Sequence, residues 1–132
     1  MGFHHELPIR YGEVDAQRVV FNAHYLAYVD DAMDHWMRLL DRDFEGLGWD
    51  FMVKRAELVW HGSATIGDLL EIESAVTRWG TTSFDVEHRL HVGDREVVTA
   101  VTTYVGIEAG TATVMAPPDS VRRHLGEPAP TG

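Results

Sequence analysis

The chain has 132 residues, no cysteine, and 11 basic against 21 acidic side chains, which give a formal net charge of −10. With 45% hydrophobic residues, this length is typical of one globular domain. We expect the domain to cover residues 1–126 and a flexible tail to cover 127–132. The lack of cysteine excludes disulfides, thiol nucleophiles and thiolate metal sites, and the negative charge argues against nucleic acid as a partner.

The chain carries no sign of a membrane segment. No apolar run approaches the roughly 20 residues that a membrane span needs. Residues 1–6 also lack the basic and apolar regions of a signal peptide. We therefore expect no membrane span and a cytoplasmic location, with which the absence of cysteine agrees.

A first strand is expected over residues 3–11, and a long helix follows it. Asn22 is a good helix cap, and Gly46 and Gly48 close the segment. Between them, apolar residues recur at helical spacing, which predicts a helix buried along one face: Leu26, Val29, Met33, Trp36 or Met37, Leu40 and Phe44. Charged residues occupy the other side, which we interpret as a solvated or subunit-facing surface: Asp30, Asp31, Asp34 and Arg38.

After the helix, the hydrophobic period changes to two, which is typical of strands. A change of parity at Lys54–Arg55 predicts a bulge, and Pro117–Pro118 leads into a short helix that ends at Leu125. The expected strands are joined by tight turns and cover about 49–60, 70–77, 84–92, 96–107 and 111–115. Such a meander is antiparallel. The sequence therefore predicts an α+β fold with one long central helix wrapped by a curved antiparallel sheet of five to six strands, and pairing of sheets between subunits.

One carboxylate, Asp15, lies between the first strand and the helix. We expect it to be close to unpaired backbone N–H groups near Ala23, His24 and Tyr25, because the first turn of a helix leaves its donors free. An ionised Asp15 could attack a carbonyl or deprotonate water while these donors stabilise the charge on the carbonyl oxygen. The competing interpretation is that Asp15 is only an Asx-type turn residue ahead of the helix.

The residues around Asp15 form a longer motif. It reads Arg10-Tyr11-x-Glu13-x-Asp15-x-x-x-Val19-Val20-x-Asn22-Ala23-x-Tyr25-Leu26, with Asp30-Asp31-Ala32 further along the helix. This pattern resembles the signature of the hot-dog acyl-CoA thioesterases, and the nearest branch is the 4-hydroxybenzoyl-CoA thioesterase family. Two later segments resemble the same family, and the resemblance covers roughly residues 5–125: Gly67-Asp68-x-Leu70-x-Ile72 and Gly80-Thr81-Thr82-Ser83-Phe84.

The resemblance implies a thioester hydrolase that assembles as a homodimer or homotetramer, with active sites at the dimer interface. Asp15 falls on the catalytic position of the family, as nucleophile or general base, and Asn22 and Tyr25 are further catalytic candidates. Substrate-binding roles are implied for residues at the helix start and near the thioester or pantetheine arm: Ala23, His24, Thr81, Thr82 and Ser83. The substrate would be an acyl-CoA or acyl-carrier thioester, and no metal or cofactor is required, since coenzyme A is part of the substrate.

Several alternatives stay open at this point. Tyr25 could be a packing residue with a hydrogen-bonded hydroxyl, and Asn22 could be only a helix cap. Arg18 stands where relatives commonly have glycine, and Asn22 stands where some have histidine. These departures motivate a second hypothesis, a catalytically silent hot-dog module that binds an acyl thioester or assembles with partners. A hot-dog dehydratase, which needs a suitable His and Asp pair, is a weaker third.

The eight histidines do not predict a metal site. His4 and His5 are adjacent on a strand and face opposite sides, and the same argument separates His88 from His91. His24 and His35 would be roughly 16 Å apart along a helix axis. We therefore expect no convergent set of ligands and no bound metal.

Overall fold

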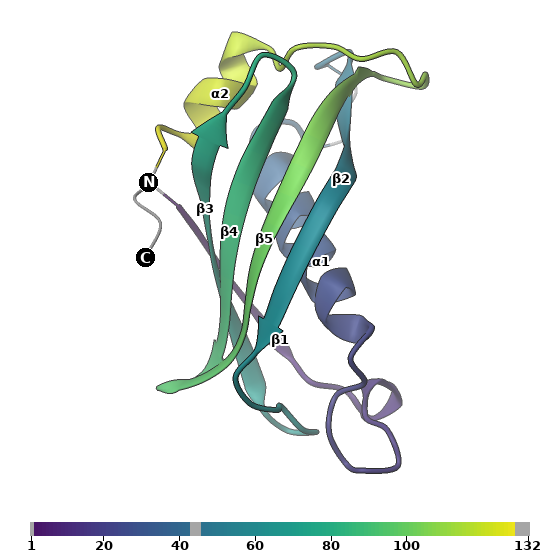
Figure 1. Cartoon of the computed structure of the whole chain (residues 1–132), viewed down its shortest axis with the longest axis vertical. Helices are drawn as coiled ribbons and strands as arrows, with labels where there is room; N and C mark the ends of the chain where they lie inside the picture. Colours follow the sequence, from purple (N-terminus) through teal and green to yellow (C-terminus); the bar gives the residue numbers. More distant parts are fainter. Residues whose placement is uncertain (1, 43–45, 129–132) are drawn as a thin grey trace.

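The computed structural model describes residues 2–42 and 46–128. Five antiparallel strands form one sheet in the order β1-β3-β4-β5-β2, and one helix lies along its concave face (Figure 1). The elements are β1 (Phe3–Pro8), the 3-10 turn η1 (Tyr11–Glu13), α1 (His24–Arg38), β2 (Trp49–Trp60), β3 (Leu69–Trp79), β4 (Ser83–Val92), β5 (Arg95–Glu108) and α2 (Asp119–Leu125). The expected α+β fold, a helix wrapped by a curved antiparallel sheet, is confirmed.

The core lies between α1 and the sheet, as the two hydrophobic periods predict. Alternate residues of β3 and β4 are buried, and α1 buries one face against them. The large buried side chains divide into two clusters along the helix, one around Tyr25 and Leu70 and one around Met33, Trp49 and Phe84. The helix is thereby fixed along its whole length.

The helix is shorter than expected. It has 15 residues and ends at Arg38, after which the N–H groups of Leu39 and Leu40 donate to the carbonyls of Trp36 and Met37 in tighter turns. Its N-cap is Ala23, without a side-chain cap bond, so the expected cap at Asn22 was wrong. Phe44, the last residue of the expected helix, lies outside the described residues.

The strands match the sequence pattern with two exceptions. The first strand, expected over residues 3–11, ends at Pro8, and Tyr11 instead begins the 3-10 turn η1. The bulge at Lys54–Arg55 is confirmed by a register shift between Val53 and Arg55. The expected short strand at 111–115 makes only an isolated bridge between Ile107 and Val114. Instead, this segment packs closely against Gly106. A Cβ atom at Gly106 would lie 2.3 Å from the Met115 carbonyl oxygen. The close approach therefore requires glycine at this position.

The sheet has two edges of different character. β1 forms one edge, and β2, with 12 residues, forms the other. β2 exposes large apolar side chains along its length: Met52, Val53, Val59 and Trp60. Such an exposed apolar edge is a template for pairing with another strand. No helix within residues 2–42 and 46–128 is long and apolar enough to cross a membrane.

Candidate active site

The loop that carries Asp15 is a tight, hydrogen-bonded turn. The N–H of Asp15 donates to the carbonyl of Val19 at 2.9 Å, and the N–H of Arg18 donates back to the carbonyl of Asp15 at 2.9 Å. Arg18 has a φ of 65°, the one positive value among the described residues other than glycine. The loop thus takes the left-handed backbone that glycine adopts cheaply, although an arginine stands there.

The Asp15 side chain both caps the turn and lines a cavity. Its Oδ1 accepts the N–H of Gln17 at 2.8 Å, as in an Asx turn. The side chain is half-buried and borders a cavity of about 620 Å³. The other lining residues are Tyr11, Gly12, Val14, Ala16, Arg18, Thr65 and Ile66. The structural and catalytic interpretations of Asp15 are therefore compatible, because one oxygen holds the turn and the other stays available.

The segment ahead of β3 holds this loop in place. The hydroxyl of Thr65 donates to the carbonyl of Arg18 at 2.5 Å, and the N–H of Val20 donates to the carbonyl of Ala64 at 2.8 Å. Asp68, from the expected Gly-Asp turn, accepts the N–H of Thr65 at 2.9 Å. The turn ahead of β3 thus holds the Asp15 loop, and Asp68 of the Gly-Asp segment orders that turn.

The motif residues Arg10 and Glu13 form a pair at η1. The Glu13 carboxylate accepts the backbone N–H of Arg10 at 2.9 Å and its Nη2 at 2.5 Å. Burial alone would raise the pKa of Glu13, but the bonds from Arg10 outweigh it and hold the pKa below its ordinary value. Glu13 therefore stays ionised and fixes the entry to the Asp15 loop.

The backbone donors at the helix start are not all unpaired, which corrects the expectation. The N–H of His24 donates to the carbonyl of Phe21 at 2.9 Å, and that of Tyr25 donates to the carbonyl of Asn22 at 3.3 Å. The N–H of Ala23 has no such partner within the described residues. Within the described residues, the unpaired N–H of Ala23 and the N–H of Tyr25, which is held by a long bond, therefore remain for a ligand at this end of the helix.

The other candidates at the helix start lie in different surroundings. Tyr25 is buried, its hydroxyl accepts the N–H of Ala64 at 3.3 Å, and burial raises its pKa. This is the packing role that the sequence left open. Asn22 and Ala23 are exposed, whereas His24 borders a smaller cavity of about 280 Å³ together with Tyr28.

Thr81, Thr82 and Ser83 lie at the far end of the sheet from Asp15. The Asp15 loop follows Pro8, which pairs with Leu69 at the start of β3, whereas the turn at residues 80–83 follows Trp79 at its end. Because a strand rises about 3.3 Å per residue, β3 separates the two by roughly 30 Å or more. Figure 1 shows the two turns at opposite ends of the molecule. A single subunit therefore does not bring these two parts of the expected site together.

A groove between α1 and β2 lies beside the exposed sheet edge. Its volume is about 560 Å³, and it is lined by Asp30, Met33, Asp34, Arg38, Asp50, Phe51, Met52, Val53 and Tyr104. Burial raises the pKa of Asp30. The acidic helix residues, expected on a solvated or subunit-facing surface, thus line a groove that the sequence pattern did not predict. The aromatic residues come from β2 and β5, so no local spacing could have indicated it.

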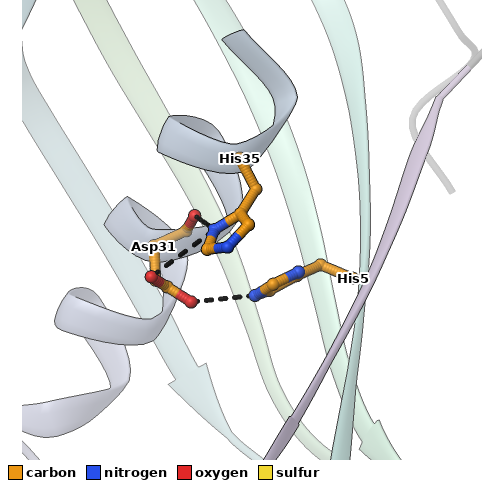
Figure 2. A group of neighbouring side chains, drawn as sticks. All are labelled: His5, Asp31 and His35. Atoms are coloured by element: carbon orange, nitrogen blue, oxygen red, sulfur yellow. Dashed lines mark hydrogen bonds and ion pairs between the residues drawn. The ribbon is translucent and has the colours of Figure 1, made fainter. Parts of the chain in front are cut away.

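The expectation that no histidines converge is also corrected. His5 of β1 lies against Asp31 and His35 of α1 (Figure 2). The spacing of histidines within one predicted element does not reveal a set built from a strand and a helix. The i, i+4 spacing of Asp31 and His35 on one helix was the available signal.

Comparison with known proteins identifies the class. Residues 9–125 match the thioesterase-like superfamily, to which the chain therefore belongs. The fold is the hot-dog fold of acyl-CoA thioesterases, and the expected class of enzyme, a thioester hydrolase acting on acyl-CoA, is confirmed.

Individual relatives agree with this class. A 1,4-dihydroxy-2-naphthoyl-CoA hydrolase of Synechococcus elongatus is 30% identical over 108 residues, which cover 78% of this chain and 79% of that protein. A 1,4-dihydroxy-2-naphthoyl-CoA thioesterase of Synechocystis superposes with a TM-score of 0.81 at 16% identity and covers 95% of this chain and 96% of its own. A putative thioesterase of Pseudomonas aeruginosa superposes with a TM-score of 0.85 at 24% identity, with 94% and 98% covered. At these identities, the two structures show that the fold is shared.

Proposed function

We propose that Asp15 is the catalytic carboxylate of this thioesterase. The observation that carries the proposal is its position: a half-buried acid on a rigid turn, bordering a cavity and following the strand that leads to the helix start. Two routes use the same free oxygen. Asp15 either attacks the thioester carbonyl, forming an anhydride that water then hydrolyses, or takes a proton from water as that water attacks. In both, the C–S bond breaks and coenzyme A leaves as the thiol.

The proposed oxyanion donors are at the start of α1. The N–H of Ala23 is the free donor there, and that of Tyr25 is held only by a long bond. The positive end of the helix dipole adds to their effect on a negatively charged oxygen. His24, beside this end, is proposed as a substrate contact.

The active enzyme is proposed to be a homodimer formed through β2, in which each site uses two subunits. An antiparallel pairing of two β2 edges places one end of a subunit beside the opposite end of its partner. The Asp15 loop of one chain would then reach the level of the groove and of Thr81–Ser83 in the other. The exposed apolar side chains of β2 support this pairing. A tetramer would add contacts between two such dimers.

We propose an aromatic acyl-CoA as the preferred substrate. The support comes from the relative that is named for 1,4-dihydroxy-2-naphthoyl-CoA and from the groove, whose apolar wall includes Met33, Phe51 and Tyr104. No metal or cofactor takes part in the proposed reaction. A cytoplasmic location remains part of the proposal.

The test is thiol release from a panel of aromatic and aliphatic acyl-CoAs by the wild type and by Asp15→Asn. Asparagine keeps an oxygen that can accept the Gln17 N–H, so the turn and the oligomer should persist. Turnover should fall by about 10²–10⁴-fold, the usual effect of losing a positioned acid or base. Asp94→Asn, in the exposed β4–β5 turn, is the matched control and should retain full activity.

Two outcomes would count against this function. Near-normal turnover by Asp15→Asn would remove Asp15 from the mechanism. Saturable binding of acyl-CoA by the wild type without thiol release would favour the alternative, a hot-dog module that binds thioesters without cleaving them.

A further inference from the structure

Two imidazoles and a carboxylate meet where the edge strand β1 passes α1. The Nε2 of His5 lies 2.8 Å from Oδ2 of Asp31, and the Nδ1 of His35 lies 3.6 Å from Oδ1 of the same carboxylate. The rings of His5 and His35 are 4.4 Å apart between centroids. Figure 2 shows His5 reaching from the strand toward the helix, with His35 one turn beyond Asp31.

The spacing of these atoms is close to that of a coordination sphere. One donor atom from each residue lies within 4.8 Å of the other two. Ligands about 2.0–2.2 Å from a tetrahedral zinc ion are roughly 3.3–3.5 Å from one another. The contacts of His5 and His35 with Asp31, at 2.8 and 3.6 Å, lie on either side of that separation, so small side-chain rotations suffice. Two hydrogen bonds must be given up, because a ring nitrogen that binds the ion carries no proton: that of His35 Nδ1 to the backbone carbonyl of Asp31 and that of His5 Nε2 to Oδ2 of Asp31, each at 2.8 Å.

The chemistry of the set favours a transition-metal ion. Two neutral imidazoles with one carboxylate suit Zn²⁺ and its neighbours rather than Mg²⁺ or Ca²⁺, which prefer oxygen ligands. The side chains of Asp31 and His35 are 47% and 52% exposed, so an ion can enter and water can complete its coordination. His5 is mostly covered, with 13% of its side chain exposed, and gives the site a fixed wall.

A second cluster, on the opposite face of β1, fits such an ion less well. It contains His4, Glu6 and Glu71, and thus a single imidazole. The nearby Glu73 carboxylate already binds Nδ1 of His4 at 2.6 Å. The carboxylates around His4 favour its protonated form, which does not bind a metal ion. The pKa of His4 is accordingly raised, chiefly by its hydrogen bond to Glu73.

We propose that His5, Asp31 and His35 form a binding site for a divalent transition-metal ion, with Zn²⁺ as the reference ion. The site joins an edge strand to the central helix. It lies at the sheet edge opposite β2, so subunit pairing through β2 leaves it open. A bound metal ion cross-links β1 to α1 and thereby stabilises the fold. The inference does not depend on the proposed role of Asp15, because none of the three residues lines the Asp15 cavity; Asp31 borders the smaller cavity beside His24.

The experiment uses the full chain without an affinity tag, stripped of metal with a chelator. Zn²⁺ is titrated by calorimetry, and Co²⁺ is titrated by its visible absorption. We expect one ion per chain, together with a rise in Tm of about 5 °C or more once the free metal reaches about 100 times Kd. His35→Ala removes an exposed side chain and should leave the metal-free Tm unchanged while it weakens binding by about 100-fold or more. His5→Ala should weaken binding to a similar extent.

The matched control is His4→Ala, on the same strand but on the other face. It should bind Zn²⁺ as the wild type does and keep the metal-dependent rise in Tm. The proposal is overturned if the wild type shows no saturable binding up to about 1 mM metal. It is equally overturned if His35→Ala binds as tightly as the wild type, or if His4→Ala is the variant that loses the ion.

Discussion

Arg18 holds a backbone conformation that normally calls for glycine. Its φ of 65° allows the turn to close between Asp15 and Val19, and Thr65 secures it by donating to the Arg18 carbonyl. A residue with a Cβ atom in this region costs about 1–2 kcal/mol. The surrounding hydrogen bonds therefore hold the Asp15 loop in a strained state.

This strain can be measured with two variants that both remove the arginine side chain. Arg18→Gly should unfold at higher denaturant than Arg18→Ala, with a difference in the free energy of unfolding of about 1 kcal/mol, because only glycine takes a positive φ without a steric cost. Urea denaturation of the two proteins checks it. Equal stabilities would mean that the loop relaxes away from this conformation.

The sequence indicated the residue types of the site better than their surroundings. Asp15 stands in the first motif, Asp68 stands in the later Gly-Asp segment, and the resemblance to the family marks position 18 as one where glycine is common. The hydrogen bonds donated by the His24 and Tyr25 N–H groups could not be predicted, because they depend on how the chain turns at Phe21 and Asn22.

Across the elements, one polar network crosses the interior of the sheet. His88 of β4 is fully buried, and it is hydrogen-bonded to Ser74 of β3 at 2.7 Å and to Thr102 of β5 at 3.1 Å. Burial lowers the pKa of His88 to about 3, so its ring is neutral in the folded protein. The network ties three strands together with an uncharged imidazole.

The pH dependence of stability follows from this shift. Below an ordinary pKa of about 6.5 the unfolded chain takes up a proton at His88 and the folded chain does not. Its contribution to stability is therefore complete above pH 6.5 and falls as the pH drops from there toward 3. Below pH 6.5, the free energy of unfolding falls by up to about 1.4 kcal/mol per pH unit through this group.

Two measurements check this. The free energy of unfolding of the wild type should fall more steeply between pH 6.5 and pH 4 than that of His88→Gln. Because both proteins contain His4, whose raised pKa has the opposite effect, the comparison cancels its contribution. In the native protein, the NMR signals of the His88 ring should not titrate between pH 7 and pH 4.5. A midpoint near 6.5 would contradict the neutral, buried assignment.

Elements were predictable where the pattern was local and strong. Periodicity and turn residues directly predict the main strands, the bulge near Lys54 and the helix that ends at Leu125. They do not predict the missing strand at 111–115, because the approach of Met115 to Gly106, a tertiary contact, decides it. They do not predict the end of α1 at Arg38 either, because the apolar spacing continues to Leu40.

For the whole molecule, the edge formed by β2 is the surface through which we propose that subunits pair. Its side chains at Met52, Val53, Val59 and Trp60 are exposed in a single chain. A charge placed there would be buried without a partner when two edges pair, which costs several kcal/mol.

We expect Val59→Lys to convert the assembled protein into a monomer of unchanged fold. Light scattering coupled to size exclusion measures the mass, and circular dichroism checks the fold. Val101→Lys, an exposed position on the inner neighbour β5, is the comparison and should leave pairing through β2 intact. A Val59→Lys protein with the wild-type mass would rule out this edge as the interface.

The separation of the Asp15 loop from the turn at Thr81–Ser83 by the length of β3 has a kinetic consequence. If each active site is complete only when a partner subunit is bound, the specific activity depends on the protein concentration. Specific activity should then decline as the enzyme is diluted past the point where dimers come apart, and it should recover on reconcentration. An enzyme whose lone chains worked would give the same rate per molecule at every dilution.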